Sequence, residues 1–204
     1  GLNSLERGAR SDAPTPLFTH YLHDPADPRS LSDNVIWSIE EASDGSLWIG
    51  TGQGLDRFEA TTGRIAHYPM APIFAIEQDI EGFLWLGTWG SGLGRLDPES
   101  GQLIFYEHDP GDLDSLGDGG VIAVHQDRDG ELWIGTFNGG LNRLDRATER
   151  FLRYENDLED PNSLSSNTVL AIHEDREGTL WIATGGGGLN RFDPQTAQFT
   201  AYRE

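Results

Sequence analysis

Two aromatic residues lie in glycine-rich segments, where such a side chain can bind a small molecule. Trp89 is followed by Gly90-Ser91-Gly92, and Phe137 by Asn138-Gly139-Gly140. An exposed aromatic ring stacks on the apolar face of a sugar, and nearby amides supply hydrogen-bond donors and acceptors. The candidate ligand-binding residues are Trp89, Phe137, Asn138, Gln53, Asn34 and Asn167. Capping a hydrophobic gap between neighbouring elements is the alternative role for both aromatics, because burial of area alone favours them there.

Titratable residues recur at a second position. His125 and His173 each precede a glycine by five residues, and the equivalent residues in the first half of the chain are Glu40 and Glu77. A ring of Glu and His can bind a metal or exchange protons. A polar rim where strands end in solvent is the interpretation that we prefer. The sequence therefore predicts no catalytic residue, no metal ligand and no cofactor.

Acidic residues cluster in three segments. These are Asp24 and Asp27; Asp109, Asp112 and Asp114; and Asp157, Glu159 and Asp160. Dense carboxylates can bind Ca²⁺, but their spacing does not match the best-known twelve-residue calcium loop. We expect solvated turns, in which Asp and Asn bond their own backbone.

The charge balance restricts the partners. The 204 residues contain 14 Lys and Arg against 34 Asp and Glu, a net charge of −20. Such a surface repels nucleic acid and anionic membranes, so neither is an expected partner. Cys is absent, which excludes disulfides and thiol catalysis but leaves secretion open. There is no apolar run of about 18 residues to span a membrane. The only Met is Met70, so we expect a segment of a longer chain.

One sequence motif, which we call the phrase, occurs four times and indicates the architecture. Leu-Trp-Ile/Leu-Gly/Ala-Thr stands at residues 47–51, 84–88, 132–136 and 180–184, with Trp-to-Trp spacings of 37, 48 and 48. An acidic residue and Gly precede each copy, and Gly-Leu, Arg and Asp follow. Periods of 20 to 50 residues are typical of stacked arrays. Because the phrase's tryptophans recur in every unit, we assign them to the core.

The third copy predicts four strands in each unit. Residues 121–125 are short and β-branched, 129–130 form a hairpin turn, and 131–136 are the second strand. Residues 141–145 and 151–154 are the third and fourth strands. A four-stranded antiparallel meander with two faces to cover predicts a β-propeller blade. The repeated Arg57, Arg95, Arg143 and Arg191 are expected to pair with Asp56, Asp97, Asp145 and Asp193.

The same four-strand pattern assigns boundaries to the blades along the whole chain. We predict an all-β fold with blades at residues 35–68, 73–106, 121–154 and 169–204 in a single propeller domain, 17–204. Residues 17–23 are expected to form the outer strand of a preceding blade. The three inner strands of that blade are not expected in the sequence before it. Residues 1–16 are a linker or the end of that blade.

The repeated unit resembles the two-component regulator propeller repeats over nearly all of residues 17–204. The acidic links at 23–34 and 157–167 are also typical of that family. The family builds propellers of about seven blades, so four units predict an open arc of a larger ring.

The resemblance implies a non-catalytic sensor segment of a bacterial hybrid histidine kinase or diguanylate cyclase. It implies a periplasmic or extracytoplasmic location and a small-molecule ligand, with oligosaccharides the leading class. It also allows a homodimer of the parent receptor, while no direct membrane contact is expected in this segment.

Two other functions stay open. The streptogramin lyases are propellers with a similar phrase, but a lyase needs His and an acid on the loop face. A protein-interaction platform needs a contiguous apolar patch on the outer strands, which instead have mixed polarity.

Overall fold

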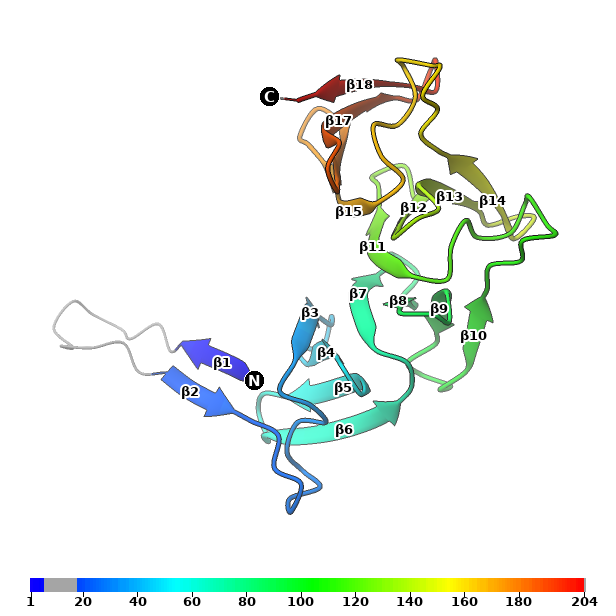
Figure 1. Ribbon diagram of the computed structural model, residues 1–204. Coiled ribbons are helices and arrows are strands. Elements are labelled where there is room, and N and C mark those ends of the chain that lie inside the picture. The colour runs from blue at the N-terminus through cyan, green and yellow to red at the C-terminus, as the bar shows by residue number, and fades with distance from the viewer. Residues whose placement is uncertain (6–17, 204) are drawn as a thin grey trace, which may run out of the picture. The chain divides into compact units, whose positions relative to one another are not determined.

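The structure is a computed structural model that describes residues 1–5 and 18–203 (Figure 1). Leu17, Glu204 and most of the predicted 1–16 segment lie outside the described residues. The chain divides into two compact units, Gly1–Pro72 and Ile73–Glu204, and each is described by itself. The described elements are all strands, and none of the described residues forms a helix that could cross a membrane.

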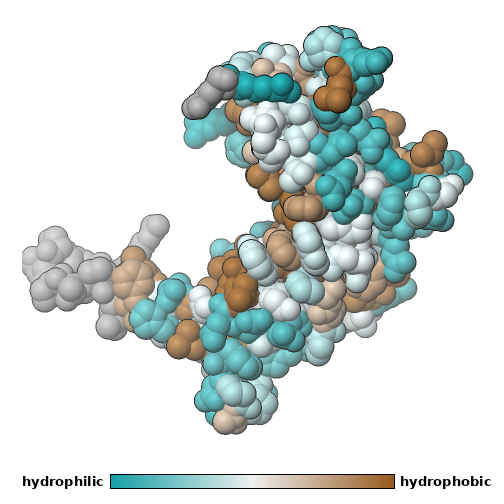
Figure 2. Space-filling view, viewed as in Figure 1, coloured by the Kyte–Doolittle hydropathy of each residue, from teal (hydrophilic) through white to brown (hydrophobic). Residues whose placement is uncertain are grey.

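The first unit holds a strand pair and one blade. The pair is β1 (Leu2–Leu5) and β2 (Phe18–Tyr21). The blade is β3 (Ile36–Glu41), β4 (Leu47–Thr51), β5 (Gly54–Glu59) and β6 (Arg64–Pro69), hydrogen-bonded in that order. A hydrophobic patch covers β3 in Figure 2, where Val35, Trp37 and Ile39 are exposed.

The second unit holds three blades. The first contains β7 (Ile73–Gln78), β8 (Leu84–Thr88), β9 (Leu93–Leu96) and β10 (Leu103–Tyr106). The next contains β11 (Val121–Gln126), β12 (Leu132–Thr136), β13 (Leu141–Asp145) and β14 (Arg150–Tyr154). The last contains β15 (Val169–Glu174), β16 (Leu180–Thr184), β17 (Gly188–Asp193) and β18 (Gln198–Tyr202). Each is an antiparallel meander, as the sequence predicts.

A tryptophan fastens each hairpin of the second unit, and Trp85 and Trp133 are buried. Trp133 Nε1 donates to Asp127 Oδ2 at 2.8 Å, while Asp127 Oδ1 accepts the backbone N–H groups of Asp129 and Glu131. The pairs Trp85–Asp79 and Trp181–Asp175 repeat this bond at 2.8 Å. In the last blade the bond from Trp181 and those from the turn backbone outweigh burial and lower the pKa of Asp175 below its ordinary value.

Two of these tryptophans, Trp85 and Trp133, also build the cores between blades. Trp133 packs edge-to-face on Phe192 of the next blade, with ring centroids 5.2 Å apart. The core at this interface consists of Trp133, Leu141, Leu164, Val169, Leu180, Ile182, Phe192 and Phe199. Trp85 begins an equivalent core with Leu116, Val121 and Phe151. The phrase is therefore a core motif in this unit.

The N-terminal strand pair contains one more strand than the sequence predicted. β1 pairs with β2 so that Leu2 lies opposite Tyr21. The third and fourth strands of all four blades use the same register, for example Leu141 opposite Tyr154. Leu2 and Tyr21 pack with Leu31, Ile49 and Phe58 of the following blade. β1 and β2 are thus placed like the outer half of a blade.

Glycine in the phrase is required by the neighbouring blade. A Cβ added to Gly135 would lie 2.6 Å from Val169 Cγ1 and 3.0 Å from the Val169 carbonyl oxygen. A Cβ on Gly87 would lie 2.9 Å from the same two atoms of Val121. Ala183 occupies the equivalent position in β16, so the strand itself accepts a methyl group.

We therefore expect Gly135→Ala to lower the free energy of unfolding by about 1–3 kcal/mol, because overpacking forces Val169 to move. Denaturant unfolding of the whole chain measures this loss. Adding Val169→Ala should remove most of the penalty in a double-mutant cycle. An additive double mutant would contradict the assignment of the penalty to this contact.

Candidate functional site

The loops that carry the candidate residues lie beside the links between blades. Phe137 N–H donates to the Gly120 carbonyl at 2.8 Å, and Gly185 N–H donates to the Thr168 carbonyl at 2.8 Å. Trp89 forms a β-bridge with Gly120. The loop between the second and third strands of each of these blades is therefore tied to a link. The loops at Phe137 and Gly185 bond the link that enters their own blade, and the loop at Trp89 bonds the link that enters the next blade. This places loops and links on one face, which we call the loop face.

An aromatic cluster stands on the loop face of the second unit. The Trp89 ring lies 5.4 Å from Phe74 and packs edge-to-face with Phe137 at 5.2 Å. Trp89 nevertheless keeps 45% of its surface exposed, and Phe137 keeps 42%. The two predicted aromatics are thus brought together, and each still offers a ring surface to a ligand.

Phe74 is a member of this cluster that the sequence reasoning missed. It lies at a β-bulge, where the pairing of β7 with β8 shifts register between Ile73 and Ala75. All four innermost strands have a bulge at this position, and its residues are Trp37, Phe74, Ile122 and Leu170. A bulged residue lies outside the regular strand register, and its side chain can point in a new direction. The detectable signal was a pair of adjacent large apolar residues in each innermost strand.

The predicted amides of the second unit have different surroundings. Asn138 is exposed beside Phe137, and among the described residues its side chain has no hydrogen-bond partner. Asn167 Oδ1 accepts the Asn156 N–H at 2.6 Å, and the Asn167 carbonyl accepts the Gly140 N–H at 2.9 Å. The Asn138 side chain is therefore available to a ligand, whereas the Asn167 side-chain oxygen is already bonded within the link between β14 and β15.

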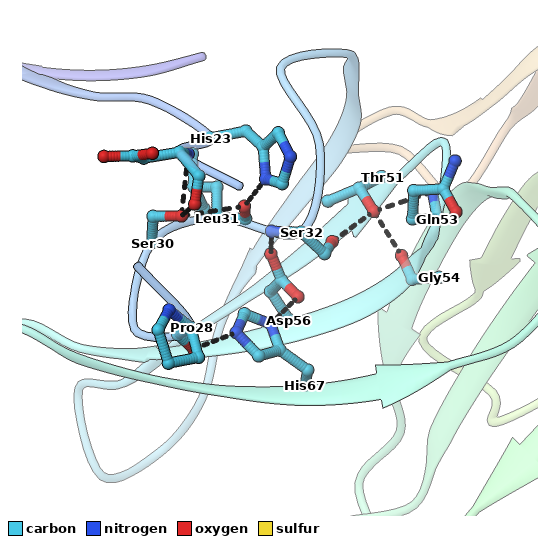
Figure 3. A network of polar contacts seen from close by, with 11 residues as sticks. His23, Pro28, Ser30, Leu31, Ser32, Thr51, Gln53, Gly54, Asp56 and His67 are labelled. Atoms are coloured by element: carbon cyan, nitrogen blue, oxygen red, sulfur yellow. Dashed lines mark hydrogen bonds and ion pairs between the residues drawn. The ribbon is translucent and has the colours of Figure 1, made fainter. Parts of the chain in front are cut away.

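The remaining two candidates belong to the first unit. Asn34 Oδ1 accepts the His23 N–H at 2.9 Å, the same closure that Asn167 makes. Gln53 is exposed, and its backbone N–H donates to Thr51 Oγ1 at 3.1 Å (Figure 3). The second unit brings Trp89, Phe137 and Asn138 together. In the first unit, Gln53 lies on the corresponding loop and Asn34 on the corresponding link.

The loop face of the second unit carries a single charge. Its loops and adjoining link ends, residues 89–92, 117–120, 137–140, 165–168 and 185–188, contain Asp118 and no Arg or Lys. Asp118 Oδ1 accepts the Gly120 N–H at 2.6 Å. The face therefore offers aromatic rings, amides, hydroxyls and one carboxylate, a set suited to an uncharged ligand.

The Glu and His residues lie at the hairpin ends of the innermost strands. His125 Nδ1 is 3.9 Å from Glu77 Oε1 on the neighbouring blade. Burial lowers the pKa of His125, against the attraction of Glu174 and Asp127. Among the described residues, no three His, Asp or Glu side chains are placed to hold a metal ion.

The acidic links form turns of one kind. Asp109 Oδ1 accepts the Gly111 N–H at 2.8 Å, and Asp112 Oδ1 accepts the Asp114 N–H at 2.9 Å. Ser115 Oγ accepts the Asp109 N–H and donates to carbonyl oxygens of the same link. The links at 24–30 and 157–163 repeat this bonding. The carboxylates thus bond the backbone, as the turn interpretation expects.

The expected Arg–Asp struts are wrong in detail. Arg57 pairs with Asp44 at 2.5 Å, and Arg143 pairs with Glu131 at 3.6 Å. Arg57 lies directly opposite Trp48 across the strands, with its guanidinium 5.2 Å from the ring. Asp56 is the next residue in the strand and so points to the opposite face. Asp145 and Asp193 instead accept N–H groups of their own turns.

Successive four-stranded antiparallel meanders define a β-propeller segment. The chain belongs to the two-component regulator propeller family, whose repeats match residues 30–53, 68–90, 115–138 and 163–186. A search of curated proteins found no match to this sequence.

Three solved structures are similar to the chain. The extracellular domain of a putative hybrid two-component system from B. thetaiotaomicron is 26% identical over 92% of this chain, with a TM-score of 0.74. A second such domain from that organism is 23% identical over 92% of the chain, with a TM-score of 0.68. The chain spans 24% of the length of each. Virginiamycin B lyase from Staphylococcus aureus is 18% identical over 83% of the chain and 56% of the lyase, with a TM-score of 0.66, and shares the fold.

We expect Phe137→Ala to lower the free energy of unfolding by about 0.5–1.5 kcal/mol, the value of one aromatic pair, because the ring is half exposed. Trp133→Ala, made as the buried reference, should cost about 3–5 kcal/mol. Chemical unfolding of both variants compares the two. A cost for Phe137→Ala equal to that for Trp133→Ala would identify Phe137 as a core cap.

Proposed function

We propose that the chain is a non-catalytic, ligand-binding part of an extracellular sensor domain in a bacterial signalling receptor. Its repeat family and its similarity to extracellular domains of two-component systems support this role. The parent receptor would carry the kinase or cyclase output, and its sensor domains would act outside the cytoplasm. A homodimer of the parent is compatible with this arrangement.

The ligand that we propose is an uncharged oligosaccharide. The observation that carries this proposal is the half-exposed Trp89–Phe137 pair on the loop face, beside the free amide of Asn138. Aromatic rings stack on the C–H faces of sugars, and an amide bonds their hydroxyl groups. Sulfated or uronic acid sugars fit less well, because no cation of this face would offset their charge.

A lyase function is the weaker candidate. The lyase of similar fold is 18% identical, which supports the fold alone. Acid–base elimination needs a proton acceptor within hydrogen-bond reach of the substrate. The histidines His125 and His173 occupy the hairpin ends of the innermost strands, whereas the aromatic cluster adjoins the opposite ends.

A titration of the whole chain tests the ligand proposal. Neutral gluco-, xylo- and manno-oligosaccharides should bind, and sulfated or uronic acid oligosaccharides should bind more weakly. Trp89→Ala and Phe137→Ala should each weaken binding by about two- to tenfold, the range for one lost stacking contact. Isothermal calorimetry measures both comparisons.

Phe105→Ala is the matched control, because Phe105 is a similarly exposed aromatic on the outermost strand β10. It should bind as the unaltered chain does. Equal binding by all three variants would contradict the site, and tighter binding of the anionic sugars would contradict the ligand class.

A further inference from the structure

His67 on β6 has a hydrogen-bond acceptor at each ring nitrogen (Figure 3). Nδ1 lies 2.7 Å from Asp56 Oδ1 on the adjacent strand β5. Nε2 lies 3.0 Å from the Pro28 carbonyl oxygen on the link between β2 and β3. The ring therefore bridges the blade and the link that enters it.

These two contacts determine the proton count of the ring. A carbonyl oxygen can only accept, so Nε2 must carry a hydrogen to bond Pro28. Asp56 is fully buried, and its Oδ2 accepts the Ser32 N–H at 2.8 Å, while its Oδ1 faces Nδ1 of His67. Beside a carboxylate at Asp56, Nδ1 must donate to Asp56 Oδ1. A neutral imidazole has one N–H, so both bonds beside that carboxylate require the imidazolium form.

The charges around the ring favour that form. Asp56 is the charged group that faces His67 from β5. Asp27 and Arg29 flank Pro28 on the link and pair with each other at 3.1 Å, with side chains 40% and 84% exposed. Burial by itself lowers the pKa of His67, but the bonds to Asp56 and Pro28 and the Asp56 charge outweigh burial and raise it above its ordinary value.

One blade of the second unit, β11 to β14, has a permanent charge at the position equivalent to His67. Arg153 lies opposite Asn142 across β13 and β14, as His67 lies opposite Asp56. Its guanidinium donates to the Ser115 carbonyl at 2.8 Å and the Asp112 carbonyl at 2.8 Å on the preceding link. Asn142 Oδ1 accepts the Gly117 N–H, as Asp56 accepts the Ser32 N–H. A cation at this position is thus a link fastener in both blades.

In the first unit the fastened link reaches the loop face. Asp56 holds the Ser32 backbone, and Ser32 Oγ lies 2.8 Å from Thr51 Oγ1. Thr51 Oγ1 in turn accepts the Gln53 N–H and donates to the Gly54 carbonyl (Figure 3). Displacement of the link therefore disturbs the loop that carries Gln53.

We propose that His67 is a proton-dependent positioning residue, which fastens the link of residues 23–34 to the first blade only while its ring carries both protons. Loss of the Nε2 proton leaves a lone pair facing the Pro28 carbonyl, and the link then loses this attachment. Arg153 gives the equivalent link a fastening that no ordinary pH removes.

The direction of the pH effect follows from the raised pKa in the folded chain. The contribution of His67 to stability is fully present below the pKa of an unfolded His, about 6.5. It is lost as the pH rises through the pKa in the folded state. Stability from this contact therefore falls on the alkaline side.

NMR of the whole chain with ¹⁵N-labelled His tests the proton count directly. Both His67 nitrogens should show protonated shifts at pH 6.5 and titrate at a higher pH. A ring that is already singly protonated at that pH would overturn the proposal.

His67→Arg tests the consequence, because it installs the residue that the second unit uses. The folding constant of the unaltered chain relative to His67→Arg should fall by about two- to tenfold between pH 6 and 9, the range for one hydrogen bond. His67→Gln, which does not titrate, should give the same trend if the Arg variant does not fold. A ratio independent of pH for the variants that fold would overturn the proposal.

His23→Asn is the matched control within the same link. His23 Nδ1 lies 2.6 Å from the Leu31 carbonyl, a bond that one N–H satisfies. Asn156 makes the equivalent bond to the Leu164 carbonyl at 2.7 Å. The folding constant of the unaltered chain relative to His23→Asn should not change between pH 6 and 9. If this ratio changes as much as the ratio for His67→Arg does, the pH effect belongs to the link as a whole, and the proposed role of His67 is overturned.

Discussion

The hydrogen bond between a buried tryptophan and its turn aspartate is the interaction on which the second unit depends. In each of its blades one carboxylate oxygen closes the hairpin turn, and the other holds the indole N–H. The Trp85 and Trp133 indoles are then oriented so that their rings pack against the next blade, as Trp133 does against Phe192. Because an unpaired indole N–H is costly to bury, the turn and the core between blades form together.

The sequence predicts the local elements well because their signals are local. The alternation in 141–145 and the turn at Asp129-Gly130 predict β13 and the hairpin before β12, and the structure has both. The Arg57 partner was wrong because Asp44 and Asp56 are both close in sequence, and only the pleat shows which one shares its face. The predicted strand at 17–23 acquires β1 as a partner, whose residues lie outside the repeated unit from which the strands were predicted.

The candidate site was only partly predictable for a related reason. Trp89 and Phe137 were detectable because they interrupt glycine-rich loops, but Phe74 reads as an ordinary strand residue. The β-bulge is visible in the sequence as a pair of adjacent large apolar residues, but such a pair is also typical of a strand buried on both faces, so it does not show where the second side chain points. His67 was missed because its role depends on Pro28, which is 39 residues away.

The close approach of Gly135 to Val169 has a mechanical consequence. Gly135 has no side chain, so the β12 backbone lies close against the Val169 side chain and carbonyl oxygen, and close-packed interiors transmit displacement rather than absorb it. The spacing of these two blades is thus limited by the contact between Gly135 and Val169. A ligand that pulls on the loop of one blade therefore also displaces the neighbouring blade.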